Sequence, residues 1–188
     1  MNNASDINMY KGLASYFLPD GVLDYFDVVD FAEEPIPNNQ YIKDFIQAYL
    51  YNAKNGGGEK TIQAVTNPKY KIYVSDSEND ESYYAGGDRQ PTVYWESRQG
   101  IVTTEGGKQS AATILEHEMD HAVDDAQNHK NHVDRADIHD AQYDNKEERR
   151  VITGSEAKTA KSNHEALRCN HRGRNYKTTS PISTKSSK

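Results

Sequence analysis

The sequence predicts an α+β fold in a single domain, and three observations support this. Apolar residues recur at helical spacing in residues 39–54 and again in residues 109–129. Between these helices, residues 69–74 and 92–95 are rich in β-branched and aromatic side chains, which is typical of strands. The chain has 188 residues, the length of one domain. We therefore expect one domain over residues 1–176, with a small sheet and several helices.

The first helix and the strands have recognisable boundaries. Three glycines at residues 56–58 end the first helical pattern. Residues 75–90 are polar and acidic, which favours a long loop between the two strands. Gly100 marks a turn, residues 101–102 resume an extended run, and Gly106-Gly107 interrupts the chain before the next helix.

Residues 109–129 predict a long helix with metal-ligand spacing, because they contain His117-Glu118-Met119-Asp120-His121 and neither Gly nor Pro. Ser110 suits the N-cap. Residues four apart on a helix are displaced by about 40° and about 6 Å, so both histidines can reach one cation. Glu118 can face a metal-bound water, as the general base of a zinc peptidase must. The alternative is an exposed helix with two solvated histidines. The expected buried positions of the helix are Ile114, Leu115, Ala122 and Val123.

A catalytic zinc ion takes three protein ligands and leaves its fourth place to water. Asp124 and Gln127 stand where the longer metzincin motif requires a glycine and a ligand, so we exclude that class. Residues 128–144 are polar without an apolar period, and helical regions follow at 145–152 and 155–168.

Three acidic residues of these later helices compete as the third ligand: Glu147, Glu148 and Glu156. First-turn acids also stabilise a helix N-terminus, which is the alternative role for the Glu147-Glu148 pair. The order of a helix, strands, a metal helix and a third-ligand helix is the layout of a zincin. In that layout an edge strand aligns an extended substrate, and residues 92–95 are our candidate for it.

The motif helix and the later segment Glu147-Glu148-Arg149-Arg150-Val151-Ile152-Thr153-Gly154 together resemble a known family. They look like the bacterial type III effector zinc metallopeptidases that cleave host MAP kinases, and like related domains of bacterial polymorphic toxins. The clostridial neurotoxin light chains share a similar Glu-Glu-x-Arg segment. Asn163-His164-Glu165-Ala166-Leu167-Arg168 and Gly173-Arg174-Asn175-Tyr176 are similar to the closing segment of the effector family. The resemblance covers about residues 91–177.

The resemblance implies that Glu148 is the third zinc ligand and that Glu147 fixes a ligand histidine. It also implies Arg and Tyr side chains that stabilise an oxyanion, for which Arg174 and Tyr176 are the candidates. Arg168 and Arg172 belong to the same cluster. We expect Asp124 and Asp125 to face solvent or to contact the ligands from outside, and we expect the other histidines to be solvated: His129, His132, His139, His164 and His171.

Composition restricts the partners and the location. Residues 158–188 carry eight Lys or Arg against one Glu, whereas the whole chain has a net charge of −7. The acidic remainder and the absence of a recognisable binding motif argue against nucleic acid. Thr, Ser and Lys dominate residues 177–188, which predicts a disordered basic tail. Cys169 is the only cysteine, so a metal would sit on His, Asp and Glu.

Residues 1–30 lack the basic head and apolar run of a signal peptide, and no window approaches a membrane span. We therefore expect a zinc-dependent metalloendopeptidase that is a secreted bacterial effector or toxin domain without a classical signal peptide, or is otherwise cytoplasmic. Its partners would be a protein or peptide substrate, with a secretion chaperone or an immunity protein as further candidates. The alternatives are a catalytically degenerate zincin-fold binding protein and a structural zinc domain with a fourth protein ligand.

Overall fold

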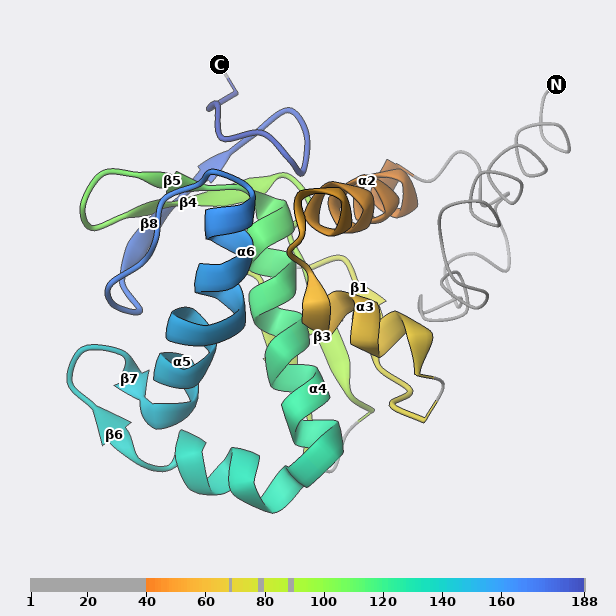
Figure 1. Ribbon diagram of the computed structural model, residues 1–188, viewed down its shortest axis with the longest axis vertical. Helices are drawn as coiled ribbons and strands as arrows, with labels where there is room; N and C mark the ends of the chain where they lie inside the picture. Colours follow the sequence, from red (N-terminus) through yellow and green to blue (C-terminus); the bar gives the residue numbers. More distant parts are fainter. Residues whose placement is uncertain (1–39, 68, 78–79, 88–89, 188) are drawn as a thin grey trace, which may run out of the picture.

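A computed structural model describes residues 40–67, 69–77, 80–87 and 90–187 (Figure 1). The expectations for residues 1–30 lie outside this part. The described chain is a mixed α+β structure, and none of its helices is long and apolar enough to cross a membrane. Its elements, in chain order, are α2 (Gln40–Asn55), α3 (Glu59–Thr66), β1 (Tyr73–Ser75), β2 (Tyr83–Ala85), β3 (Thr92–Tyr94), β4 (Gln99–Thr103), β5 (Lys108–Gln109), α4 (Ala111–Ala136), β6 (His139–Asp140), β7 (Asp144–Asn145), α5 (Lys146–Val151), the π-helix η4 (Ile152–Glu156), α6 (Ala157–Ser162) and β8 (Gly173–Lys177).

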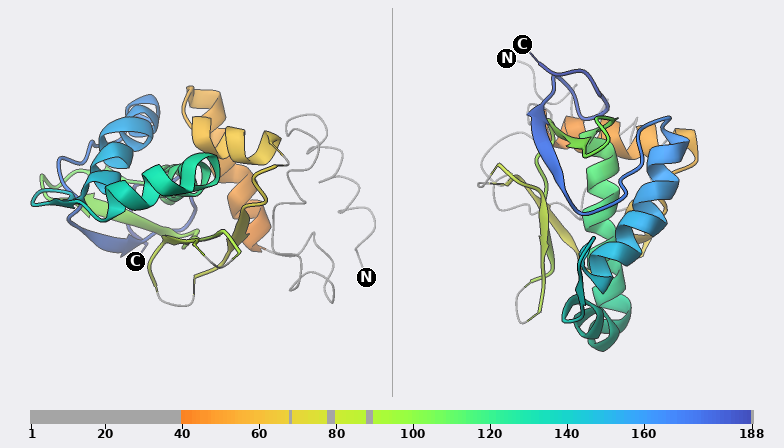
Figure 2. Two further views of the ribbon diagram at one scale, coloured as in Figure 1. Left: turned by 90° about the horizontal axis from the view of Figure 1, so that it is seen from below. Right: turned by 90° about the vertical axis from the view of Figure 1, so that its left-hand side faces the viewer.

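Two three-stranded sheets lie beside the long helix α4. In the first, with the order β1-β3-β2, β3 runs parallel to β1 and antiparallel to β2. The second has the order β5-β4-β8 and is antiparallel throughout. The right-hand view of Figure 2 shows the strands of these sheets on one side of α4 and the helices α5 and α6 on the other. β6 and β7 form a separate hairpin.

The N-terminal half of α4 is the centre of the core. Its apolar residues pack against α2, α3 and the first sheet, and Trp95 Nε1 donates a hydrogen bond to Ala111 O at 2.8 Å. Phe45 meets the Trp95 ring edge-on, an arrangement that aromatic pairs favour. The helix that carries the histidine motif is therefore fixed along its first turns. Its fully buried apolar residues are Ala111, Ala112, Leu115, Met119, Ala122 and Val123.

α4 begins where the sequence predicts, but another residue caps it. Ser110 occupies the N-cap without a side-chain capping bond. Glu165 Oε2 instead accepts hydrogen bonds from Ser110 N at 2.9 Å and from Thr113 Oγ1 at 2.7 Å. A carboxylate at this end also interacts favourably with the helix dipole. The capping group is therefore distant in sequence.

α4 extends beyond its predicted end because the helix breaks and starts again. Asn128 has φ −156° and ψ 77°, and its Oδ1 accepts a hydrogen bond from Asn131 N at 3.2 Å. Asn128 thereby caps a second segment over residues 129–136. Residues 128–144 have no apolar period, so the sequence did not indicate this helical segment, which starts at a cap.

Three other differences separate the predicted elements from those observed. α3 follows the glycines at residues 56–58, and β2 forms inside the predicted loop of residues 75–90 because it pairs with β3. The third helical region ends at Ser162 instead of residue 168. Shortly after this end, His164 takes a positive φ of 56°. Each difference depends on a turn or on a strand pairing that local periodicity does not report.

Residues 177–187 are packed in the structure, in contrast to the expected tail. Thr178 N donates to Arg98 O and Ala112 N donates to Pro181 O, both at 2.8 Å. Ile182 packs against the core. The composition was misleading because the carbonyl of Pro181 satisfies an N–H group in the first turn of α4, where the helix has no acceptor of its own.

Glu116 joins α4 to α3 through a buried carboxylate. The residue at the N-cap of α3 is Gly58, which has a φ of 72° and no side chain that could cap the helix. Glu116 supplies the acceptors: Oε1 receives Lys60 N at 2.8 Å, and Oε2 receives Thr61 N at 2.9 Å and Thr61 Oγ1 at 2.7 Å. One carboxylate thus satisfies three donors at the start of α3.

Glu116→Ala should therefore lower the free energy of unfolding by about 3 kcal/mol or more, because it leaves two backbone N–H groups and the Thr61 hydroxyl without their acceptor, and each buried unsatisfied group costs about 1–3 kcal/mol. Urea unfolding of the metal-free protein, followed by circular dichroism, measures the change. The matched control is Glu59→Ala, which removes an exposed carboxylate from the same helix start and should cost less than about 1 kcal/mol. Equal losses in both variants would contradict the capping role.

Candidate metal centre

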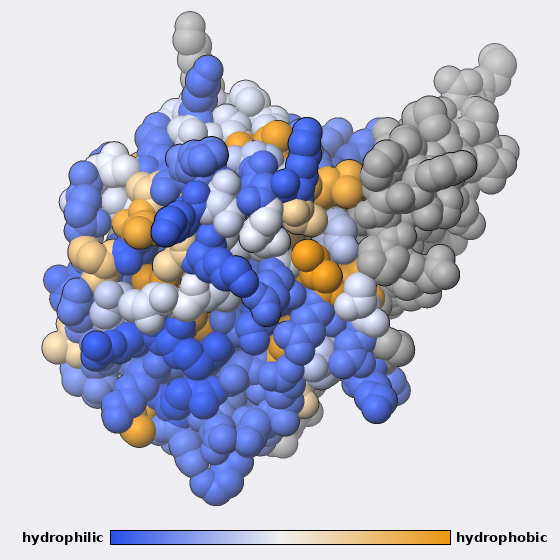
Figure 3. Space-filling model, in the orientation of Figure 1, coloured by the Kyte–Doolittle hydropathy of each residue, from blue (hydrophilic) through white to orange (hydrophobic). Residues whose placement is uncertain are grey.

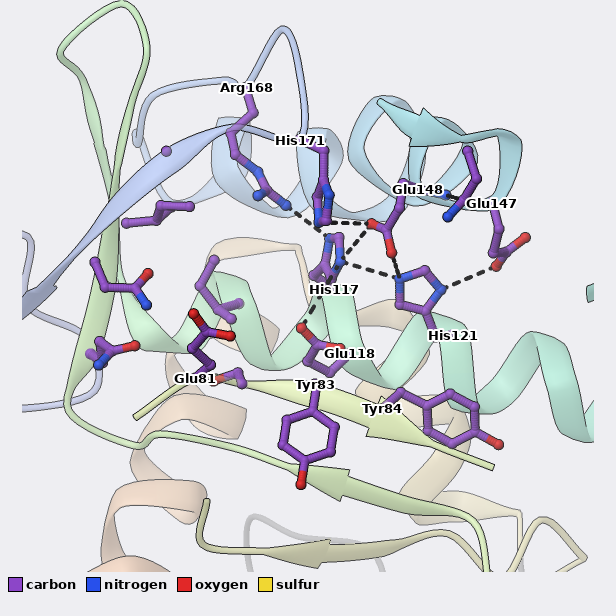
Figure 4. A pocket seen from close by; sticks show the side chains of 18 of the residues that line it. Glu81, Tyr83, Tyr84, His117, Glu118, His121, Glu147, Glu148, Arg168 and His171 are labelled. Carbon is purple, nitrogen blue, oxygen red and sulfur yellow. Dashed lines mark hydrogen bonds and ion pairs between the residues drawn. The ribbon is translucent and has the colours of Figure 1, made fainter. Parts of the chain in front are cut away.

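His117 and His121 meet Glu148 where α4 packs against α5. One turn of α4 separates the histidines, and their Nε2 atoms lie 3.2 Å apart. Glu148 lies in the first turn of α5. Its Oε2 is 3.2 Å from His117 Nε2 and its Oε1 is 3.3 Å from His121 Nε2 (Figure 4). Ligand atoms of all three side chains lie within 4.8 Å of one another, so this trio could hold a metal ion.

The outward-facing nitrogens of both rings show that the donor set fits a cation. His117 Nδ1 lies 2.7 Å from Glu156 Oε2, and His121 Nδ1 lies 3.2 Å from Glu147 Oε1. Carboxylates only accept hydrogen bonds, so each Nδ1 carries a hydrogen, and once a ring has given up its second proton it directs a lone pair inward from Nε2. Two lone pairs and a carboxylate in such close contact repel one another unless positive charge lies among them. Protons on the imidazoles would supply that charge, and so would a bound metal ion that replaced them.

The electrostatics of the site favour positive charge at the same atoms. Burial alone lowers the pKa of a histidine, but Glu147 and Glu148 raise the pKa of His121 to about 10. Neighbouring carboxylates likewise overcome burial at His117 and raise its pKa to about 8. Burial opposes the charged form of Glu148 too, yet the two histidines hold its pKa far below its usual range. A site that stabilises protons on imidazoles also attracts a metal cation, which replaces them.

Glu118 lies beside the ligand group without belonging to it. Its side chain is nearly buried, and Oε1 is 4.0 Å from His117 Nε2. Burial raises the pKa of Glu118, while the charges of His117 and His121 act in the opposite direction. A carboxylate with increased proton affinity at this position is suited to act as a general base.

Glu156 lies behind His117, away from the ligand atoms. It is fully buried, and its Oε1 accepts from Gln109 Nε2 at 2.8 Å and from Arg168 Nε at 2.9 Å. Burial raises the pKa of Glu156, but Arg168 and His117 outweigh it and lower the pKa to about 2. The sequence left Glu156 as a competing ligand; in the structure it contacts His117 Nδ1 and does not belong to the group of His117, His121 and Glu148 that could hold a metal ion.

Glu147 contacts His121 in the manner that the resemblance implies. Two guanidinium groups hold its carboxylate, Arg150 through Nη2 and Arg135 through Nε, each at 2.6 Å. His132 Nδ1 lies 3.3 Å from Glu147 Oε1. The sequence predicted a solvated His132, whereas this ring contacts a buried carboxylate. Arg135 and His132 both come from the second segment of α4, which packs back toward α5.

The ligand group opens into a cavity of about 700 Å³ (Figure 4). Tyr83 and Tyr84 of β2 line one wall, and residues of β4 and β8 line another. Within the described chain β2 is an edge strand, since only β3 pairs with it. The sequence predicted that residues 92–95 form the edge strand that aligns a substrate. These residues contain β3, which occupies the centre of its sheet. The assignment was wrong because β2 lies in a polar segment that periodicity did not identify.

The two predicted oxyanion residues occupy different environments. Arg174 is exposed and lines the cavity. Tyr176 donates its hydroxyl to Gln109 O at 3.0 Å, and its ring lies over Gly100, where a Cβ would come within 2.6 Å of the hydroxyl oxygen. The structure does not bring Tyr176 into the cavity.

His171 is a cavity residue that sequence reasoning placed in solvent. Its ring stacks on that of His117, and its Nδ1 lies 2.6 Å from Asp144 Oδ2. Pairing of β8 with β4 brings the preceding loop to this position. No motif or periodicity surrounds His171 in the sequence, so no local signal identified it.

The fold and the site together define an α+β protein with a group of His and Glu side chains that could hold a metal ion. Comparisons with protein-family models, with curated proteins and with solved structures found no match. A conclusion about function therefore depends on the chemistry of the site.

Proposed function

We propose that the protein is a zinc-dependent metalloendopeptidase with a zincin-like arrangement of the motif helix, the third-ligand helix and an edge strand. The observation that carries this proposal is the convergence of His117, His121 and Glu148 next to Glu118 in one cavity. Two imidazoles and one carboxylate are a donor set of catalytic zinc, as in gluzincin-type enzymes. Oxygen-only donors would instead favour magnesium or calcium.

The three possible ligands, Glu118 and the carboxylates behind the two imidazoles would each have a role in peptide hydrolysis. A bound zinc ion would supply Lewis-acid polarisation of the scissile carbonyl and would lower the pKa of a water molecule. Glu118 would accept a proton from the attacking water and deliver it to the leaving amine. Glu147 and Glu156 would hold the two ligand imidazoles in their orientations, since their contacts fix both Nδ1 atoms.

The edge of β2 that pairs with no strand of the described chain suits an extended peptide. A substrate strand can pair with the backbone of an edge strand, while alternate side chains enter pockets on either side. Tyr84 is already fixed there, because its hydroxyl donates to Asp125 Oδ2 at 2.5 Å. This arrangement favours an endopeptidase that binds unfolded or extended segments of a protein substrate.

The two alternative functions fit the site less well. A structural zinc domain needs a fourth protein ligand, but the His117 trio consists of three residues and adjoins a large cavity. A catalytically degenerate binding protein would have no need of Glu118 beside the ligands. The sequence resemblance further supports a secreted bacterial effector or toxin domain, with a chaperone or immunity protein as its partner.

The proposal is tested by loading the full chain with zinc and exposing it to a peptide library with mass-spectrometric detection of products. We expect cleavage at internal peptide bonds, loss of cleavage after treatment with a chelator, and recovery when zinc is restored. Zinc binding without cleavage would support the binding-protein alternative and overturn the proposal.

The third ligand has its own test. Glu148→Ala should weaken zinc binding more than Glu147→Ala or Glu156→Ala, because it removes a direct metal bond. Loss of a group that only orients a ligand typically reduces affinity about ten- to a hundredfold. Competition titrations against a chelator would rank the three variants. If Glu156→Ala proved the most damaging, the assignment of Glu148 would be wrong.

A further inference from the structure

One carboxylate of the cavity lining has no role in the mechanism above. Glu81 lies two residues before β2, and in Figure 4 its side chain points into the cavity. It is exposed and has no ion-pair partner among the described residues. By contrast, Glu118, Glu147 and Glu148 each lie within 4.0 Å of an imidazole of the motif helix. Glu81 is therefore available to a positive group of a substrate.

The wall formed by β4 and β8 carries a buried amide without a partner. Gln99, the first residue of β4, is only 7 % exposed and lines the cavity. Its side chain makes no hydrogen bond within the part of the chain that the structure describes. Buried amides are generally hydrogen-bonded, so Gln99 is suited to bond a group that enters the cavity.

Strand pairing brings Gln99 close to the segment that carries Glu81. Lys177 stands directly opposite Gln99 in the pairing of β8 with β4, so the two side chains share one face of the sheet. Lys177 Nζ lies 2.5 Å from Asp80 Oδ1, and Asp80 immediately precedes Glu81. Gln99 and Glu81 therefore approach the same part of the cavity from its two walls.

This part of the cavity has a surplus of negative charge. Lys177 is shared between Asp80 and Glu96, whose Oε2 lies 3.8 Å from Nζ. Burial raises the pKa of Glu96, Lys177 lowers it, and Asp76 and Asp80 raise it further. One lysine thus faces several carboxylates, and within the described ranges it makes no ion pair with Glu81.

The arginines of the cavity lining do not neutralise Glu81 either. Arg168 is paired with Glu156. Arg174 stands opposite Val102 in the register, so it projects from the other face of the sheet than Gln99, because side chains alternate along a strand. The positive charge that complements Glu81 would therefore come from the substrate.

We propose that Glu81 and Gln99 form a specificity site for a basic side chain of the substrate, an arginine or a lysine at one fixed position relative to the cleaved bond. This inference rests on the proposed peptidase function and names the class of peptide that the cavity selects. A peptide paired with the edge of β2 runs past Glu81, whose carboxylate pairs with the positive group. Gln99 Oε1 accepts a further hydrogen bond from the same group.

The kinetic test uses a peptide cleaved in the library, prepared with arginine, citrulline or glutamate at the selected position. Citrulline has nearly the shape of arginine without its charge. In the parent chain, kcat/KM should be on the order of tenfold higher for the arginine form than for the citrulline form, because the ion pair is partly exposed. Glu81→Gln should remove most of this preference and leave cleavage of the citrulline form unchanged. Gln99→Met should reduce the preference less than Glu81→Gln does.

Charge reversal provides a sharper comparison. Glu81→Lys should make the glutamate form a better substrate than the arginine form, which the loss of a merely structural side chain would not do. The matched control is Asp137→Lys, which makes the same change of charge at an exposed residue outside the cavity lining. Its preference should equal that of the parent chain.

A binding test does not require cleavage. The probes are short, blocked and fluorescently labelled peptides of alanine and threonine, with a central arginine or citrulline. Fluorescence anisotropy measures their affinity for zinc-loaded chains that carry Glu118→Gln. The arginine probe should bind on the order of tenfold more tightly than the citrulline probe, and the further substitution Glu81→Gln should abolish the difference. Zinc affinity should be the same with and without Glu81→Gln.

The outcomes separate this inference from the function on which it depends. A preference for arginine that persists in both Glu81→Gln and Glu81→Lys would overturn the inference and leave the peptidase intact. Cleaved peptides that share no basic residue at a fixed position would do the same. If the parent chain cleaves no peptide but its preference for the arginine probe depends on Glu81, the proposed function fails, and the site is supported as that of a binding protein.

Discussion

His117→Ala or His121→Ala should abolish zinc binding in a chain that otherwise binds about one zinc ion. Each substitution removes one of three ligands, and the remaining imidazole and carboxylate are too few donors for tight binding. The fold should survive, since Glu156 remains paired with Arg168 and Glu147 with Arg150. Elemental analysis after dialysis, with circular dichroism as a check on folding, measures the result.

The matched control for this experiment is His129→Ala on the same helix. His129 is exposed, and in the described part of the chain its partner is Asp125. Its loss should leave the zinc content unchanged. Full zinc occupancy in both His117→Ala and His121→Ala would remove the basis of the metal site.

Glu118→Gln should reduce peptidase activity by about 10²- to 10⁴-fold while the zinc content stays the same. Glutamine has nearly the same shape as glutamate and keeps a carbonyl oxygen, but it cannot accept the proton of the attacking water. Since Glu118 lies outside the ligand group, the metal should be held as before. Steady-state cleavage of the library peptide together with elemental analysis tests both statements.

Glu105→Gln is a suitable control, because it makes the same chemical change at an exposed turn between β4 and β5. It should leave kcat within about twofold of the parent. If Glu118→Gln retained activity within a few fold of the parent chain, Glu118 would not be the base, and another acceptor in the cavity would have to replace it.

The sequence predicted the part of the site that depends on local helix geometry. His117, Glu118 and His121 belong to one turn of α4, so their spacing alone determines which side chains lie near one another. Glu147 and Glu148 are adjacent in α5; in the structure Glu147 contacts His121 Nδ1, and Glu148 lies with His117 and His121 in one group that could hold a metal ion. The structure therefore agrees with the predicted grouping of these five residues.

The surroundings of the ligands could not be predicted, because they are set by tertiary contacts. Glu156 is the last residue of the π-helix η4, whose wider turn changes the face that its side chain occupies, and it thereby reaches His117 from behind. His132 approaches through the restarted segment of α4. His171 depends on strand pairing, so nothing in its own neighbourhood distinguishes it from a solvated histidine.

The elements of the fold were likewise predictable where their signal is local, and unpredictable where it depends on tertiary contacts. The helices α2, α4 and α5 were predicted because their apolar spacing or their acidic first turn is local. β2 was missed because a three-residue strand in a polar segment is recognisable only from its partner β3. The C-terminal residues were misassigned for a related reason: Ile182 and the carbonyl of Pro181 are useful to the fold only once α4 is present to receive them.

The pairing of β8 with β4 has a consequence for how activity arises during folding. It joins Gln99–Thr103 to Gly173–Lys177, and the entire ligand group lies in the chain between these strands. Closing so long a loop is entropically costly and slows folding, so we expect this pairing to form after the helices. A nascent or partly unfolded chain thus carries the complete histidine motif but lacks a wall of the cavity and His171. Hydrolysis would begin only after the last strand has docked.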